Sequence, residues 1–201
     1  MSFLDLPSPL WVLGTDTGVG KTFVAARIAQ AWTQAGPVVY RKPFQTGVYS
    51  AEDPEADAMA LRAPGIAVET GVTLQKPLSP LAAAEKEGRS LDLEALASWT
   101  TRPVANGTRL LLEGAGGVMV PLAPHRTFLA WASELHIPAV LVARGGLGTL
   151  NHTLLSCEAL MLRGWTISLV ILNPDLDGSQ RPALDNAALL RRFLPVPVEI
   201  L

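Results

Sequence analysis

The sequence predicts an α/β fold in which helices cover both faces of a doubly wound, mostly parallel sheet. Short apolar segments of strand length alternate with helical segments along the chain, as in βαβ units with right-handed crossovers. Apolar residues make up 49% of the 201 residues and charged residues only 17%, which suits a sheet buried on both faces. This length favours one domain over residues 1–201, with a substantial core.

The first elements are a strand, a glycine-rich loop and a helix. Residues 10–13 are a short apolar run, as expected of a buried strand, and residues 23–35 carry apolar side chains at the spacing of one helix face. Between them, residues 14–22 read Gly-Thr-Asp-Thr-Gly-Val-Gly-Lys-Thr. In that position backbone N–H groups and the helix N-terminus favour a bound phosphate group. The alternative is an ordinary glycine-rich turn.

The spacing within this loop departs from the general phosphate-loop pattern. Five residues, not four, separate Gly14 from Gly20, and Thr15 stands where the first glycine is usual. The end of the loop keeps the pattern, so Lys21 would reach terminal phosphates and the Thr22 hydroxyl would ligate Mg²⁺.

The later elements are bounded by turn and capping residues. Three helix N-caps are predicted, at Asp53-Pro54, at Ser79-Pro80 and at Asp92. Strands are predicted at residues 38–40, 110–112, 139–142, 167–172 and 196–200, and helices at residues 53–61, 80–87, 92–100, 127–136, 151–162 and 181–193. Residues 45–53 are predicted as a polar loop, and residues 63–78 hold at most one short strand.

Ligands of parallel α/β sheets bind outside the carboxyl ends of the strands. Five polar or glycine residues stand at or just past the end of a predicted strand: Gly14, Lys42, Glu113, Arg144 and Asn173. We therefore expect them along one edge of the sheet, which is the predicted ligand site.

Three charged residues near that edge carry candidate chemistry. Lys42 offers a compact positive charge that can approach a phosphoryl oxygen, although a solvated strand-end charge is the alternative. Glu113 follows three leucines directly, and a buried carboxylate there requires a cationic partner, such as Mg²⁺. Asp57 lies near the start of a predicted helix. It could be a metal ligand, or it could simply interact favourably with the helix dipole.

Other classes of function find no support in the composition. A net charge of −2 gives no electrostatic basis for non-specific nucleic-acid binding. The chain carries no signal-peptide pattern and no apolar run of about 18 residues, so neither secretion nor a membrane span is expected. The single cysteine, Cys157, excludes an intramolecular disulfide and fits a reducing compartment. We expect its side chain to pack in the protein interior. The histidines lack metal-ligand spacing, and no nucleophile–base pair stands out.

Several motifs together resemble dethiobiotin synthetases, which are P-loop NTPase-like proteins. The motifs, in the family's order, are residues 14–22 with their five-residue spacing, Lys42-Pro43 followed by Thr46-Gly47, residues 57–61, Glu113-Gly-Ala-Gly-Gly117, residues 147–155 and Asn173 after a strand. They cover most of the chain, and the unusual loop spacing is the family's own form.

The resemblance implies an ATP- and Mg²⁺-dependent cyclo-ligase that acts in biotin biosynthesis in the cytoplasm. In this reaction carbon dioxide adds to an amine of 7,8-diaminopelargonate, ATP phosphorylates the carbamate, and the second amine displaces phosphate to form the ureido ring. The resemblance also implies a homodimer with the substrate at the interface, and neither a nucleic acid nor a membrane as partner.

The resemblance also implies roles for individual residues. Lys21 and Lys42 would be catalytic, and Thr22, Asp57 and Glu113 would hold Mg²⁺. The implied ATP-binding residues are Gly18, Val19, Gly20, Lys21, Thr22, Phe23, Asp57, Glu113, Gly114, Ala115, Gly116 and Asn173, the last of them at the adenine. The implied substrate-binding residues are Thr17, Thr46, Gly117, Val118, Leu147, Gly148, Thr149 and Asn151, with Asn151 capping a helix.

The sequence departs from the family at two places, and four alternative functions are considered beside it. Gly18 stands where many members carry an acid, and the segment after Val198, which helps enclose adenine in the family, is short here. A partitioning-type ATPase would carry an extra lysine where Asp16 stands, and a glutamine-dependent synthetase would need a further domain. A small-molecule kinase would not depend on carbon dioxide, and a pure nucleotide-binding module would release no diamine-dependent phosphate.

Overall fold

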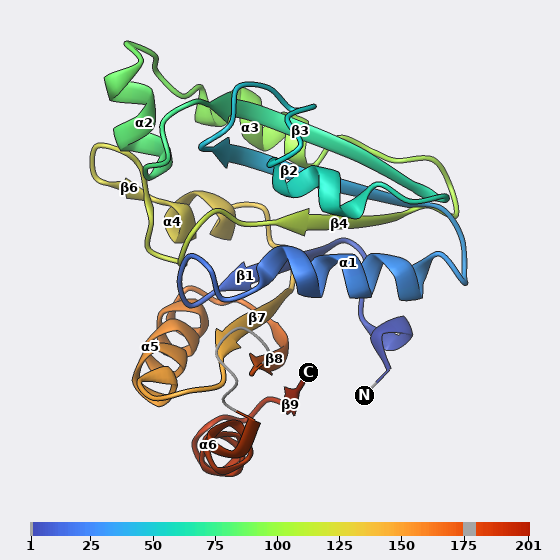
Figure 1. The fold of residues 1–201 in the computed structure, drawn as a ribbon, viewed down its shortest axis with the longest axis vertical. Coiled ribbons are helices and arrows are strands. Elements are labelled where there is room, and N and C mark those ends of the chain that lie inside the picture. The colour runs from blue at the N-terminus through green and yellow to red at the C-terminus, as the bar shows by residue number, and fades with distance from the viewer. Residues whose placement is uncertain (1, 175–179) are drawn as a thin grey trace.

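The computed structural model describes residues 2–174 and 180–201, and it confirms the predicted α/β fold (Figure 1). Seven parallel strands form the main sheet in the order β3-β2-β4-β1-β7-β8-β9. The strands are β1 (Leu10–Gly14), β2 (Val38–Thr46), β3 (Ile66–Leu74), β4 (Arg109–Glu113), β5 (Pro121–Ala123), β6 (Arg126–Thr127), β7 (Ala139–Arg144), β8 (Ile167–Asn173) and β9 (Val198–Ile200). The α-helices are α1 (Lys21–Trp32), α2 (Pro80–Lys86), α3 (Leu93–Thr100), α4 (Phe128–Ser133), α5 (Thr149–Leu162) and α6 (Gln180–Phe193), with 3₁₀ helices η1 (Phe3–Asp5) and η2 (Asp57–Leu61).

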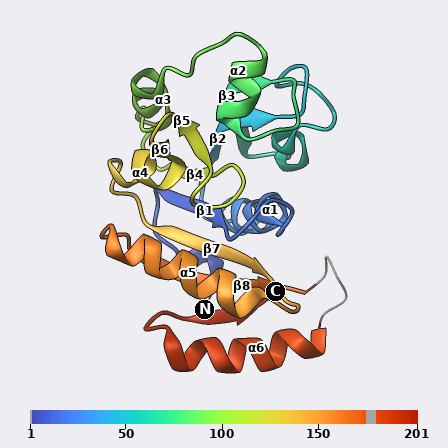
Figure 2. The same cartoon turned by 90° about the vertical axis from the view of Figure 1, so that its left-hand side faces the viewer.

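The two faces of the sheet are covered by different helices, because side chains alternate along each strand. In β1, Leu10 and Val12 pack with α1, whereas Trp11 and Leu13 belong to the opposite core with α3 to α6. The Trp11 ring meets that of Phe128 edge-on, with centroids 5.3 Å apart. Figure 2 shows α1 on one side of the strands and α3 and α4 on the other. This arrangement explains why the strands are apolar on both faces.

Strand β2 was predicted too short, at residues 38–40. It continues to Thr46, because its second half pairs with β3 as far as Leu74. The polar loop predicted from residue 45 therefore begins later. Pro43 is tolerated in this strand because β4 pairs with β2 only up to Arg41, which leaves one neighbour beyond it. As a result Lys42 and Thr46 lie within a strand and not after one.

The helix predicted over residues 53–61 is wrong in its first half. The Asp53 carboxylate accepts the backbone N–H groups of Tyr49 and Glu55, which closes a turn, and only η2 is helical. Asp57 still begins a helical turn. Helix α5 also starts earlier than predicted, at Thr149 after Gly148 with φ of 88°, so Asn151 does not cap it.

Residues 63–78, where at most one short strand was predicted, contain the nine-residue strand β3. The remaining predicted elements are confirmed with shifts of a few residues at their ends. Ser79, Asp92 and Thr127 each accept a backbone N–H as N-caps of α2, α3 and α4, although α4 ends at Ser133. The sheet of β5 and β6 and the helix η1 were not predicted. No helix in residues 2–174 or 180–201 is long and apolar enough to span a membrane.

Candidate active site

A cavity of about 1030 Å³ opens at the carboxyl edge of β1, β2 and β4, where the sequence predicts the ligand site. Its walls come from the glycine-rich loop, the end of β2, the loop after β4 and one face of α5. Residues far apart in the sequence, such as Thr17, Thr46, Glu113 and Ser156, line the same space. The fold thus assembles one site from segments that span most of the chain.

The glycine-rich loop has the geometry of an anion-binding turn. Gly18 and Gly20 have φ of 71° and 91°, a region that favours glycine. A Cβ on Gly14 would lie 2.9 Å from Val19 Cγ2, so only glycine lets the loop fold back against its own base. Gly20 caps α1 without a side-chain bond, and the first turn of this helix contains no acidic residue. The N–H groups of that turn can therefore meet a phosphate group.

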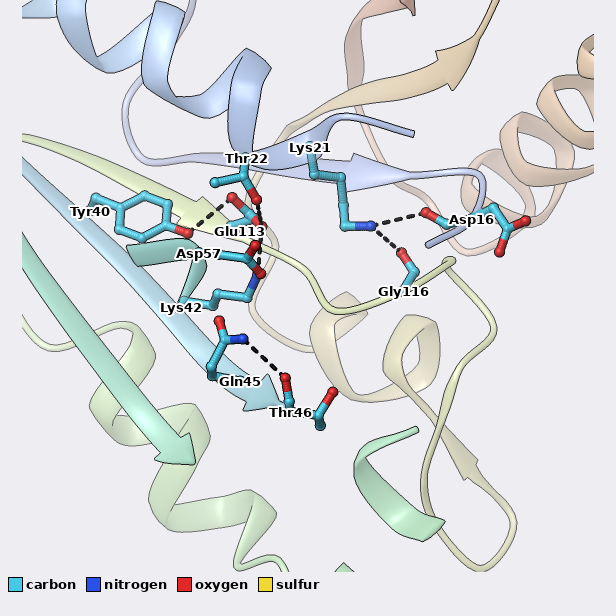
Figure 3. A network of polar contacts seen from close by, with 10 residues as sticks. All are labelled: Asp16, Lys21, Thr22, Tyr40, Lys42, Gln45, Thr46, Asp57, Glu113 and Gly116. Carbon is cyan, nitrogen blue, oxygen red and sulfur yellow. Dashed lines mark hydrogen bonds and ion pairs between the residues drawn. The ribbon is translucent and has the colours of Figure 1, made fainter. Parts of the chain in front are cut away.

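Lys21 points across the mouth of this loop (Figure 3). Its Nζ donates to the carbonyl oxygens of Asp16 and Gly116, each at 2.9 Å, and so links the glycine-rich loop to the loop after β4. Burial lowers the pKa of Lys21 to about 8; the attraction of Glu113 works against this shift and the Lys42 ammonium works with it. Both partners of Lys21 are neutral carbonyls, so its charge is still available to an anion.

A second lysine lies at the centre of a charged network. Lys42 Nζ donates to Glu113 Oε1 at 2.6 Å and forms an ion pair with Asp57 (Figure 3). Burial by itself lowers the pKa of Lys42, but the carboxylates of Glu113 and Asp57 outweigh burial and raise it. Lys42 is therefore a fixed, fully protonated cation that faces the cavity.

Glu113 has a donor on each carboxylate oxygen. Thr22 Oγ1 donates to Oε1 at 2.9 Å, and the Tyr40 hydroxyl donates to Oε2 at 2.9 Å. Burial and the Glu113 carboxylate raise the pKa of Tyr40 well above its usual value, so Tyr40 remains a donor. These contacts explain how the Glu113 carboxylate, which is 1% exposed, is tolerated directly after three leucines.

The oxygen atoms around Lys42 suit a hard divalent cation. The Thr22 hydroxyl and the carboxylates of Asp57 and Glu113 are the ligand types that Mg²⁺ prefers. In the described ranges no group of three or more histidine, cysteine or acidic residues forms a metal centre of another kind. A site for Mg²⁺ here would thus need further oxygens, from water or from phosphate groups.

Most of the residues predicted for the site line this cavity, and some do not. The residues that line it are Thr17, Gly18, Gly20, Lys21, Thr22, Lys42, Thr46, Asp57, Glu113, Ala115, Gly116, Gly117 and Val118. The residues outside its lining are Val19, Phe23, Gly114, Leu147, Gly148, Thr149, Asn151 and Asn173. Among these, Asn173 is buried and its amide donates to the Val19 carbonyl at 3.3 Å, whereas Leu147 is fully exposed.

The site also contains residues that were not predicted from the sequence. Tyr40 lies two residues before Lys42, and the period of a strand would have put both side chains on one face. His152 and Ser156 are one turn apart on α5 and line the cavity together. Cys157 is buried, as expected, and burial raises its pKa to about 12, so it is no nucleophile.

The chain is similar over most of its length to one described family and to several known proteins. Residues 9–199 match the family described as "AAA domain". The ATP-dependent dethiobiotin synthetase BioD of Paramagnetospirillum magneticum is 38% identical over 192 residues, which cover 94% of this chain and 88% of that protein. The enzyme of the same name from Anaeromyxobacter dehalogenans is 40% identical over 168 residues, covering 82% and 75%. A third, from Haloferax mediterranei, is 37% identical over 188 residues, covering 93% and 80%.

Proposed function

This chain belongs to the ATP-dependent dethiobiotin synthetase family, and on that premise we propose that it closes the ureido ring of 7,8-diaminopelargonate with carbon dioxide and ATP. The observation that carries the proposal is the Lys42 ammonium, which is held between Asp57 and Glu113 and faces the glycine-rich loop. A cation at this place suits both a carbamate and a phosphoryl group in transfer. The reaction is proposed to occur in the cytoplasm, which fits the lone buried Cys157.

The proposed reaction has three steps. An amine nitrogen attacks carbon dioxide and loses a proton, giving a carbamate. A carbamate oxygen then attacks the γ-phosphorus of ATP, and ADP leaves. Finally the second amine attacks the carbonyl carbon and loses a proton, the C–O bond to phosphate breaks, and the ring closes as phosphate leaves. None of these steps needs a covalent enzyme nucleophile.

The roles proposed for the lysines follow from their contacts. Lys21, between two carbonyls of the flanking loops, binds the terminal phosphates of ATP together with the N–H groups from Gly18 to Phe23. Lys42 stabilises charge on the carbamate and the transferring phosphoryl group. Phosphoryl transfer depends mostly on such positioning and charge stabilisation.

Thr22, Asp57 and Glu113 are proposed to hold Mg²⁺. The support is the set of hard oxygen donors and the Thr22–Glu113 bond, which brings a loop hydroxyl and a carboxylate within 2.9 Å. Mg²⁺ bound there supplies charge neutralisation at the phosphates of ATP. Tyr40 keeps Glu113 oriented, since its hydroxyl holds the second carboxylate oxygen.

Further residues are proposed to bind the diamine, the carbamate and other parts of ATP. Thr17 and Thr46 are proposed to bind the diamine or carbamate, and both line the cavity. Gly114, Ala115 and Gly116 are proposed to approach ATP through their backbone. Asn173 is proposed to meet adenine, although its amide already donates to the loop carbonyl of Val19.

Phosphate release is the direct test of this function. We expect the protein to release phosphate from ATP only when 7,8-diaminopelargonate, bicarbonate and Mg²⁺ are all present, with dethiobiotin formed in equal amount. Phosphate and dethiobiotin would be quantified in the same reaction. ADP formed with the diamine but without dissolved carbon dioxide, and with no free phosphate, would indicate a small-molecule kinase. ATP binding without any diamine-dependent release would indicate a nucleotide-binding module.

We further propose that the protein is a homodimer and that the turn from Leu147 to Asn151 binds the substrate carboxylate in the partner's site. In support, this segment includes the first turn of α5, whose first N–H groups lack helical partners, and it does not line the cavity of its own chain. Gly117 and Val118, which line the cavity, would contact the same end of the substrate. A long substrate with its amines near Lys42 needs an anion site at some distance from them.

Mixing two inactive variants tests this composite site. We expect Lys21→Ala and Leu147→Asp each to be inactive, Leu147→Asp because it adds a negative charge on a fully exposed side chain of the turn. After subunit exchange, the mixture should recover about a quarter of wild-type activity, since half of the dimers are hybrids and each holds one intact site. Mixing Lys21→Ala with itself is the control. Exchange without any recovery would contradict binding in trans.

A further inference from the structure

The side chain of Gln45 is a polar group of the cavity that the proposed roles leave unused. It lies on β2 between Lys42 and Thr46, is 5% exposed, and lines the cavity (Figure 3). Among the buried side-chain nitrogen and oxygen atoms of the described ranges, only two have no hydrogen-bond partner, Gln45 Oε1 and Trp11 Nε1. Trp11 belongs to the aromatic core and is not part of the cavity wall.

The orientation of the Gln45 amide is determined by its neighbour. Its Nε2 donates to the Thr46 carbonyl oxygen at 3.1 Å. A carbonyl can only accept, so the NH₂ group must face it, and turning the amide over would set two acceptors against each other. The unpaired Oε1 is therefore kept on the other side of the amide.

A buried acceptor without a donor is unfavourable, and a ligand that brings an N–H group would relieve that cost. The phosphate groups of ATP and carbon dioxide carry only acceptors. The amines of the diamine, and the N–H of its carbamate, are donors. ATP also has donors on its adenine and ribose, but adenine is proposed to bind at Asn173, which does not line the cavity. Among the groups proposed to react beside Lys42, the amines of the diamine are therefore the donors that suit Gln45 Oε1.

Resting on the function proposed above, we propose that Gln45 is a substrate-binding residue, whose Oε1 accepts an N–H of one amine of the diamine. A neutral amide suits this task better than a carboxylate would. A carboxylate stabilises the ammonium form, which has no lone pair for attack, whereas an amide binds the N–H of a neutral amine without that bias. The nearby carboxylates of Asp57 and Glu113 are already paired with Lys42.

Binding of single-amine probes tests the proposal. Kd values would be measured by calorimetry for the diamine, for ATP, and for two nonanoic acids with one amine each, at carbon 7 or carbon 8. In Gln45→Met, which keeps the length but loses the acceptor, the Kd of the diamine should rise about tenfold, as expected for one lost hydrogen bond. One monoamine should weaken to the same extent, while the other monoamine and ATP should bind as before.

Gln75→Met is the matched control, because Gln75 is exposed and lies outside the cavity wall. An unchanged Kd for the diamine in Gln45→Met would overturn the proposal. Equal weakening of ATP and both monoamines would overturn it too, since a purely structural residue would act on all ligands alike. If the wild type bound ATP but no diamine, the proposed function itself would fail. If the wild type binds both, a change in the Kd of the diamine seen only in Gln45→Met bears on the Gln45 subsite alone.

Discussion

Replacing Lys42 with alanine is expected to lower kcat by about 10³-fold or more, the scale seen when a charge that stabilises a transition state is removed. Lys42 is expected to act on charge that develops during phosphoryl transfer, so the KM for ATP should change by only a few-fold. Initial rates over a range of ATP concentrations at saturating diamine measure both constants.

The Lys42→Ala variant also leaves Glu113 and Asp57 without their cation. Loss of one partner of a buried ion pair typically destabilises a protein by about 3–5 kcal/mol, so the Tm should fall as well. ATP binding therefore has to be measured on the same preparation, to show that the variant is folded. Lys86→Ala removes a lysine at the end of α2, outside the cavity wall, and should behave like the wild type. A near-normal kcat in the folded Lys42→Ala variant would disprove the catalytic role.

Replacing Lys21 with alanine is expected to weaken ATP binding by about 10²- to 10³-fold, as expected for the loss of two charge-assisted hydrogen bonds to phosphate. Turnover should then be too slow to detect at ordinary ATP concentrations. Calorimetric titration with ATP gives the Kd directly and separates this variant from Lys42→Ala.

The effect of Lys21→Ala on stability should be smaller than that of Lys42→Ala. The partners of Lys21 are the backbone carbonyls of Asp16 and Gly116, so its removal leaves no unpaired buried carboxylate. Thermal unfolding of both variants makes the comparison. An unchanged Kd for ATP in Lys21→Ala would contradict the assignment of this residue to the phosphates.

The parts of the site that the sequence predicts are those with a local signal. Residues 14–22 combine glycines, a lysine and a threonine at fixed offsets between a strand and a helix, and the loop geometry follows from that pattern. Glu113 stands out because a carboxylate after three leucines needs a partner wherever it is buried. Ser79 and Asp92 cap helices through contacts within three residues, which sequence spacing also reveals.

The parts that the sequence does not predict depend on partners far along the chain. The second half of β2 is a strand because β3 pairs with it, and no periodicity within residues 41–46 signals this. The Tyr40–Glu113 bond spans 73 positions of the sequence. Asp53 fits a helix N-cap and a closed turn equally well by residue type, and its bonds to Tyr49 and Glu55 select the turn.

The position of Lys42 inside a paired strand links the site to the cooperative unfolding of the whole sheet. Its backbone is aligned with Thr70 of β3, and its ion pairs reach β4 and η2. Glu113 ends β4, which is paired on both sides, and we expect such a central strand to open only with global unfolding, whereas η2 is a single 3₁₀ turn whose Asp57 side chain is 40% exposed. Local opening of η2 would therefore release Asp57 while Lys42 and Glu113 remain paired, so we expect the two carboxylates of the site to differ in their dynamics.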